Sequence, residues 1–177
     1  MNPVQVVPPG DEVDHITAAW QAQLPGLDVE PMHVFSRIHR LADHLEATRR
    51  VAFSSHDLAQ WEFDVLAALR RAGEPFELTP GRLVSETHVS SGTMTHRLDR
   101  LTMRGLVERH GSDGDRRIVL VRLTDAGRSR VDAAVAVLVQ HERDLLASLS
   151  DQEASGLAAL LRTVLRTYEN DSTEPSR

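Results

Sequence analysis

Residues 79–130, TPGRLVSETHVSSGTMTHRLDRLTMRGLVERHGSDGDRRIVLVRLTDAGRSR, contain the pattern that decides the fold. Thr79 can cap a short helix whose first residue is a proline. A second helix follows almost at once, with Ser90 or Ser91 at its start and Gly105 permitting the left-handed stop. Its apolar residues recur at helical spacing: Val89, Met94, Leu98 and Leu101. Two helices joined by a tight turn predict a helix-turn-helix.

After Gly105 the hydrophobic period changes from that of a helix to that of a strand. The polar segment GSDGD separates Leu106 and Val107 from residues 118–123, which alternate between two faces. This pattern predicts a β-hairpin with a Gly/Asp-rich tip, and Arg116 and Arg117 lie just past that tip. A helix-turn-helix followed by a cationic hairpin is a winged helix. The Ser/Thr/His/Arg-rich outer face of its second helix suits the major groove, and the wing arginines suit the narrow minor groove.

This stretch resembles the MarR family of transcriptional regulators. The matching residues are the helix SSGTMTHRLDRLTMRGLVER (90–109) and the wing pattern Asp115-x-Arg117-x-x-x-Val121-x-Leu123-Thr124. The resemblance implies a mainly α-helical protein with a β-hairpin wing, which acts as a DNA-binding regulator and is expected to be a repressor. It also implies that Asp115 holds Arg117 for insertion into the minor groove.

The composition narrows the function classes. The chain has 177 residues and no Cys, which excludes disulfides and a cysteine-based redox switch. Its net charge of −6 is unevenly distributed, since residues 79–130 hold ten Arg against six Asp and Glu, a net +4, and the flanks carry −10. A cationic face on an acidic body orients a protein on a polyanion. No apolar run is long enough to span a membrane and no signal peptide is present, so we expect a soluble cytoplasmic protein.

The flanking segments predict further helices. We expect a disordered N-terminus (1–10), N-terminal helices for dimerisation and ligand binding (11–56), the winged helix (57–123), C-terminal dimerisation helices (124–169) and a disordered tail (170–177). Both terminal segments have apolar faces too broad for one winged helix to cover, so a second copy is the expected partner. In the MarR family these helices build the dimer.

A homodimer presents two recognition helices to double-stranded DNA, which predicts a pseudo-palindromic operator. We assign base and phosphate contacts to polar residues of the recognition helix and the wing: Ser90, Ser91, Thr93, Thr95, His96, Arg100, Asp115, Arg116 and Arg117. The alternative for the helix residues is that some of them only cap or solvate the helix.

A second group of residues predicts an effector site. Asp64 interrupts an apolar run, Arg71 lies two turns further along the same helix, and Arg97 belongs to the recognition helix. If Asp64 or Arg71 contacts Arg97, an ion pair controls the recognition helix. With Trp20 on an extra N-terminal helix, the order resembles the urate-responsive PecS-like and HucR-like branch of the family. That resemblance implies that Trp20 and the two arginines hold a planar anionic purine, which repels Asp64.

Alternatives remain open at this point. Trp20 can simply fill a subunit interface, and the charges can be ordinary surface groups. Branches of the family that respond to citrate- or aconitate-like carboxylates offer a second effector class, and an architectural DNA-binding protein without an effector offers a second function. No catalytic set is apparent, and the nine His show no metal-ligand spacing. We therefore expect no enzyme activity, no cofactor and no metal.

Overall fold

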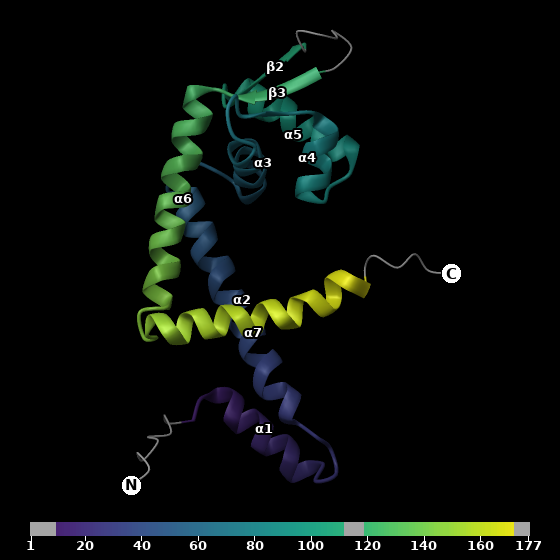
Figure 1. Ribbon diagram of the computed structural model, residues 1–177, viewed down its shortest axis with the longest axis vertical. Helices are drawn as coiled ribbons and strands as arrows, with labels where there is room; N and C mark the ends of the chain where they lie inside the picture. The colour runs from purple at the N-terminus through teal and green to yellow at the C-terminus, as the bar shows by residue number, and fades with distance from the viewer. Residues whose placement is uncertain (1–9, 112–118, 172–177) are drawn as a thin grey trace, which may run out of the picture. The chain divides into compact units, whose positions relative to one another are not determined.

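The computed structural model describes residues 10–111 and 119–171, and its fold is mainly helical with a small antiparallel sheet (Figure 1). The contacts divide the chain into two compact units, Met1–Val51 and Ala52–Arg177. The predicted fold class, a winged helix-turn-helix with an extra N-terminal helix, is confirmed. The elements in order are α1 (Glu12–Gln23), α2 (Glu30–Ser54), α3 (Gln60–Arg71), β1 (Glu77–Leu78), α4 (Pro80–Thr87), α5 (Ser91–Met103), β2 (Val107–Gly111), β3 (Val119–Leu123), α6 (Asp125–Leu145) and α7 (Asp151–Asp171).

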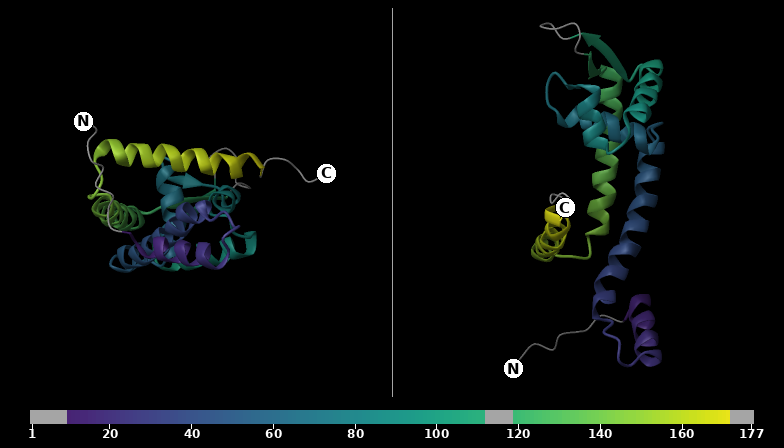
Figure 2. Two further views of the ribbon diagram at one scale, coloured as in Figure 1. Left: turned by 90° about the horizontal axis from the view of Figure 1, so that it is seen from below. Right: turned by 90° about the vertical axis from the view of Figure 1, so that its right-hand side faces the viewer.

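In the first unit, α1 lies beside the N-terminal part of α2 (Figure 2). The Asp11 carboxylate caps α1 by accepting hydrogen bonds from the first-turn N–H groups. Arg37 of α2 forms ion pairs with Asp11 at 2.8 Å and Asp14 at 2.7 Å. Hydrogen bonds from Arg37 hold the pKa values of both carboxyls below their ordinary range. Charge pairing at the rim therefore supports the buried contacts of Val13 and Thr17.

The helix-turn-helix consists of α4 and α5, and its boundaries follow the predicted capping residues. The Thr79 hydroxyl accepts from the Arg82 N–H at 3.3 Å, and the Ser90 hydroxyl accepts from the Thr93 N–H at 3.2 Å. Gly105, with φ of +67°, adopts the left-handed conformation that ends α5 and turns the chain into β2. Between the two predicted cap residues for α5, the structure selects Ser90.

The wing strands β2 and β3 form the predicted antiparallel hairpin, in which Val107 lies opposite Leu123. The short strand β1 was not predicted, because two residues are too few to show a period. It pairs with the other edge of β3, so the sheet order is β1-β3-β2. Residues 112–118, which include Asp115, Arg116 and Arg117, lie outside the described residues.

The core of the second unit is formed by buried apolar residues of α3, α4, α5, the sheet and α6, where they extend as far as Leu138. In Figure 1 these elements lie together around the start of α6. Met94, Leu98 and Leu101 are buried, as their spacing predicts, and Val89 of the same series is partly buried. Leu83 of α4 is also buried. Burial of apolar surface of this kind supplies most of the folding free energy. Gly127 lies against the backbone of Leu106, and a Cβ at this position would collide with the Leu106 carbonyl oxygen. The close approach of α6 to the wing therefore requires glycine.

The last helix, α7, begins at a capping box formed by Ser150 and Glu153. The Ser150 hydroxyl accepts from the Glu153 N–H at 3.3 Å, and the Glu153 carboxylate accepts from the Ser150 N–H at 2.8 Å. The Ser150 hydroxyl also donates to the Glu153 carboxylate at 2.7 Å, and this hydrogen bond, together with the one from the Ser150 N–H, lowers the pKa of Glu153. Four leucines on this helix are exposed: Leu157, Leu160, Leu161 and Leu165.

Candidate nucleic-acid interface

The recognition helix α5 buries one face and exposes the other. Buried Met94, Leu98 and Leu101 fix its rotation on the core. The predicted DNA-contacting residues of the helix are all exposed: Ser90, Ser91, Thr93, Thr95, His96 and Arg100. Two of them also have structural roles, because Ser90 caps the helix and the Thr95 hydroxyl donates to the Ser91 carbonyl at 3.0 Å. The outer face therefore offers hydroxyl, imidazole and guanidinium groups, which can donate to base edges and phosphates.

Two arginines of α5 share one aromatic neighbour that the sequence did not single out. The guanidinium carbon of Arg100 lies 5.1 Å from the centroid of the Trp61 ring, and that of Arg97 lies 5.6 Å from it. Trp61 is the second residue of α3 and packs partly against the core. These distances lie within the range of a cation–π interaction. The first turn of α3 therefore restrains both side chains.

A second unpredicted contact connects the wing to the recognition helix. Arg109 of β2 forms an ion pair with Asp99 of α5 at 2.7 Å and donates to the Thr95 carbonyl at 3.4 Å. Arg109 and Asp99 belong to different elements, and the sequence alone does not show that these elements meet. It places the base of the wing against the exposed side of α5.

A cluster of charges fixes the far end of α5. Arg104, the residue that ends the helix, donates to the Glu62 carboxylate at 2.5 Å and to both the carbonyl and the carboxylate of Asp57. Arg130 of α6 also contacts the Asp57 carboxylate, at 2.9 Å. Glu62 is 3% exposed and accepts a further hydrogen bond from the Ala59 N–H. The hydrogen bond to Glu62 raises the pKa of Arg104 further above its ordinary value, so this cation stays charged.

The charges at the base of the sheet form another group. One oxygen of Glu77 in β1 accepts hydrogen bonds from Arg122 of β3 at 2.7 and 2.9 Å, and lies 3.0 Å from the His110 ring of β2. Arg122 and, to a smaller degree, His110 lower the pKa of Glu77, although burial opposes this shift. All three strands of the sheet are therefore joined at one carboxylate.

The four residues of the predicted effector site lie in both units. Trp20 belongs to the first unit and is 46% exposed. In the second unit, the Asp64 carboxylate accepts from Gln60 at 3.1 Å and Arg71 forms an ion pair with Glu86 of α4 at 3.8 Å. Arg97 instead lies over Trp61. Arg71 and Arg97 therefore contact different partners, and the effector site stays a prediction.

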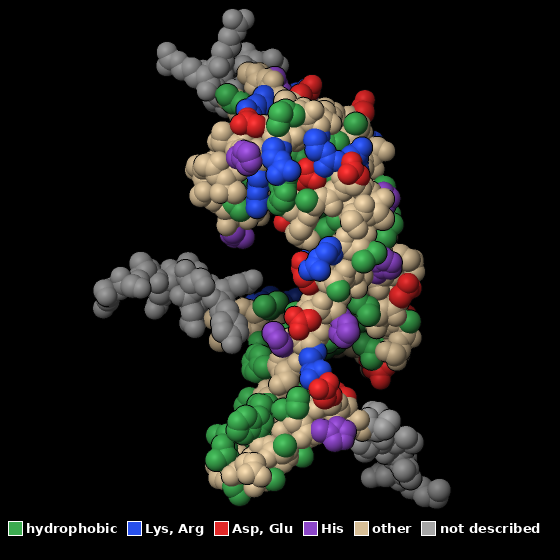
Figure 3. Space-filling view, turned by 180° about the vertical axis from the view of Figure 1, so that it is seen from behind, with side chains coloured by type: hydrophobic (Ala, Val, Ile, Leu, Met, Phe, Trp, Pro, Cys, Tyr) green, Lys and Arg blue, Asp and Glu red, His purple; other side chains and the backbone are tan. Residues whose placement is uncertain are grey.

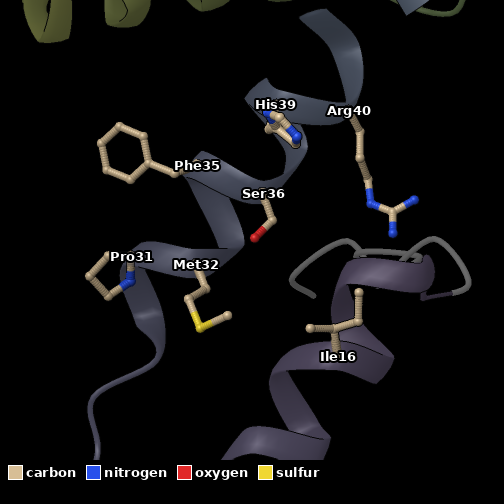
Figure 4. A pocket seen from close by; sticks show the side chains of 7 residues that line it. All are labelled: Ile16, Pro31, Met32, Phe35, Ser36, His39 and Arg40. Atoms are coloured by element: carbon tan, nitrogen blue, oxygen red, sulfur yellow. The ribbon is translucent and has the colours of Figure 1, made fainter. Parts of the chain in front are cut away.

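The first unit contains an open groove of about 480 Å³ between α1 and α2. Figure 4 shows Ile16, Met32 and Phe35 around this hollow, with Arg40 at its edge. None of the four predicted effector residues lines it. Arg40 forms an ion pair with Glu12 at 2.7 Å, so its charge is already matched. The groove is mainly an apolar surface rather than a built anion site.

Figure 3 shows arginine side chains interspersed with acidic ones on one face of the winged-helix unit. Within residues 10–111 and 119–171, no group of three or more His, Asp and Glu side chains is arranged to hold a metal ion. In the same part of the chain, no helix combines the length and apolar character needed to cross a membrane.

Comparison with known proteins decides the family. The chain is 38% identical over 160 residues to the HTH-type transcriptional regulator PecS of Dickeya dadantii, which covers 90% of this chain and 96% of that protein. Residues 56–118, which span the helix-turn-helix and the start of the wing, match the MarR family model. The chain belongs to the MarR family. This confirms the resemblance seen in the recognition helix and the wing.

Other relatives agree. The chain is 31% identical over 129 residues to the multiple antibiotic resistance protein MarR of Escherichia coli, covering 72% of this chain and 88% of that protein. The crystal structure of a mutant E. coli MarR complexed with operator DNA superposes with a TM-score of 0.61 and 28% identity, covering 82% of this chain and 97% of that chain. These relatives are regulators and not enzymes. The chain is a DNA-binding transcriptional regulator of the MarR family.

One further solved structure concerns ligand control. It describes the regulation of DNA binding of Bordetella bronchiseptica BpsR by 6-hydroxynicotinic acid. This chain superposes on it with a TM-score of 0.59 and 27% identity, covering 74% of this chain and 91% of that chain. Ligand-controlled DNA binding is therefore present in a protein of similar fold.

Proposed function

We propose that the chain binds a pseudo-palindromic operator as a homodimer and represses transcription until a small planar anion such as urate releases it. The observation that carries this proposal is the exposed polar face of α5, which has buried apolar residues behind it and arginines beside it. A helix held on the core in this way can enter the major groove of DNA while its arginines contact the phosphate backbone. Similarity to PecS over 90% of the chain supports the same interpretation.

In this proposal the contacts divide by chemistry. Thr95 and His96 lie on the exposed side of α5 and contact base edges, together with Ser91. Arg100 contacts a phosphate, and so do Ser90 and Thr93 at the helix start, where backbone N–H groups favour anions. In the wing, Asp115 steadies Arg117, which enters the minor groove beside Arg116.

Dimerisation is supported by apolar side chains that the second unit leaves exposed. They lie on α6, at the residue that follows it and on α7, and each is more than a third exposed: Val135, Val139, Leu145, Leu146, Leu157, Leu160, Leu161 and Leu165. Apolar side chains that gather on a protein surface commonly mark a site where a partner binds. A second copy with two-fold symmetry would cover the same surface on both chains.

The effector proposal assigns Trp20, Asp64, Arg71 and Arg97 to one anion. In the present structure Arg71 is engaged by Glu86 and Arg97 by Trp61. An anion that binds these arginines must compete with those partners, so it changes contacts made by α4 and α5. Urate is flat, carries one negative charge near neutrality, and has paired acceptors suited to a guanidinium. A ligand lowers operator occupancy only by its differential affinity, and a tenfold loss requires about 1.4 kcal/mol.

The test is a gel shift on the DNA upstream of the chain's own gene, with and without urate. We expect the parent to bind as a dimer and to be released by urate. Arg71→Ala is expected to bind the same DNA and to ignore urate. An Arg71→Ala variant that responds like the parent removes this arginine from the effector site.

Two alternatives correspond to different results. A citrate- or aconitate-like carboxylate would also suit two arginines, and a thermal shift in citrate but not in urate or xanthine would favour it. An architectural DNA-binding protein without an effector would show no shift with any of the three. Arg117→Ala should weaken operator binding under either alternative, because the wing contacts DNA whether or not an effector exists.

A further inference from the structure

We propose that Trp61 is a positioning residue for DNA binding, and that its ring holds Arg97 and Arg100 as a paired cationic site for one backbone phosphate. The inference rests on the proposed role of α5 at the DNA. It adds a residue of α3 to the interface and gives Arg97 a DNA-side role beside its proposed part in effector binding.

The spacing on α5 places the two arginines together. Arg97 and Arg100 are three residues apart, so their side chains leave the helix on the same side. Two guanidinium groups in this arrangement repel each other. The negative face of an aromatic ring offsets part of that repulsion, and tryptophan is the most effective ring for this purpose. Both guanidinium carbons lie within 5.6 Å of the Trp61 centroid.

The next arginine of the same stripe behaves differently. Arg104 is neutralised by Glu62, the residue that follows Trp61, and by Asp57. Arg97 and Arg100 lie instead over the uncharged ring of Trp61. The first turn of α3 thus fixes one arginine by charge and holds two others by a neutral ring.

A neutral ring holds the two guanidinium groups without cancelling their positive charges. Arg100 is exposed and Arg97 is half-buried, so both heads remain near solvent. A phosphate bridging the two guanidiniums would supply the missing negative charge through charge-assisted hydrogen bonds. Because Trp61 is already packed against the core, the side chains lose less freedom when the phosphate binds.

The experiment is a double-mutant cycle on DNA affinity. Phosphate contacts carry no sequence information, so a fluorescein-labelled duplex of arbitrary sequence at low salt is a sufficient probe. The four proteins are the parent, Trp61→Leu, Arg97→Gln/Arg100→Gln, and the triple variant. We expect Trp61→Leu to weaken binding by about three- to tenfold, on the scale of a cation–π interaction. It should cause no further loss when both arginines are already glutamine.

A matched control separates positioning from general damage to α3. Phe63 is two residues further along, and its ring stacks on Phe53 at 3.9 Å rather than on an arginine. Phe63→Leu should therefore have the same effect on affinity with and without the arginines. Trp61→Phe retains a ring and should restore part of the affinity lost in Trp61→Leu. This rescue variant also serves if Trp61→Leu does not fold.

Three outcomes overturn the proposal. The first is an affinity loss for Trp61→Leu that is equally large in the presence and absence of Arg97 and Arg100. The second is parent affinity in Trp61→Leu or, if that variant does not fold, in Trp61→Phe. The third is parent affinity in the double arginine variant, which would also remove the assigned DNA face. The first and second outcomes leave the proposed function intact, whereas the third does not.

Discussion

Arg104 donates a 2.5 Å hydrogen bond to the carboxylate of Glu62, a side chain that is only 3% exposed. The pair joins the residue that ends the recognition helix to the first turn of α3. A buried carboxylate without its cation is costly, because desolvation then has no compensating charge. The orientation of α5 on the core is therefore coupled to this pair.

Replacing Arg104 alone should destabilise the protein more than replacing both Arg104 and Glu62. We expect Arg104→Leu to lower the free energy of unfolding by about 2 kcal/mol, below the range for a fully buried pair because Arg104 is partly exposed. Arg104→Leu combined with Glu62→Leu should recover part of that loss. Urea denaturation measures both. Equal or greater instability in the double variant would show that Glu62 is not penalised when it is alone.

The ionised Glu77 carboxylate is expected to stabilise the fold, so the protein should become less stable at acidic pH. Hydrogen bonds from Arg122, opposed by burial and assisted by His110, depress its folded-state pKa. Its contribution to stability is therefore present above the unfolded pKa of about 4.3 and is lost as the pH falls through the lower folded value. In Glu77→Gln, the free energy of unfolding should fall less between pH 5 and pH 3 than it does in the parent. Parallel profiles for variant and parent would contradict this assignment.

Gly127 and Gly156 form a matched pair of helical glycines. A Cβ on Gly127 meets the Leu106 backbone, whereas one on Gly156 meets nothing within 4 Å. Gly127→Ala should lower the free energy of unfolding by about 1–3 kcal/mol through overpacking. Gly156→Ala should raise it by about 0.5–1 kcal/mol, because alanine is the better helix former. Thermal unfolding of both variants checks the opposite signs, and the same sign for both would refute the packing of α6 on Leu106.

Ser90 caps α5, so Ser90→Ala should destabilise the protein by about 1 kcal/mol. The matched control is Ser129→Ala, which changes an exposed serine within α6. Hydrogen exchange of the first α5 amides should accelerate in Ser90→Ala alone. If the control accelerates these amides equally, the cap hydrogen bond does not account for the order of α5.

Local chemistry made the winged helix predictable. Thr79 and Ser90 cap helices by binding residues three positions away, and Gly105 ends a helix by its own backbone conformation. Such local caps and turns can be recognised in the sequence. Leu98 and Leu101 follow from periodicity for the same reason. Strand β1 could not be predicted, because its pairing with β3 depends on residues more than forty positions away.

The contacts around the recognition helix were harder to predict. Trp61 matched the apolar stripe of α3, and nothing in its spacing distinguished a core ring from one that faces two arginines. Arg109 and Arg104 were counted as part of a basic surface, but each has an acidic partner on another element. Such pairings depend on how helices cross, and a single sequence does not contain that information.

The central claim is that Arg100 and its neighbours on α5 bind a DNA backbone. The most direct measurement is the salt dependence of affinity for a labelled duplex, compared between the parent and Arg100→Gln. Each lost phosphate contact should reduce the slope of log K against log salt by about 0.9, so a dimer that loses two contacts should show a slope lower by about 1.8. An unchanged slope in Arg100→Gln, with unchanged affinity, would contradict the claim.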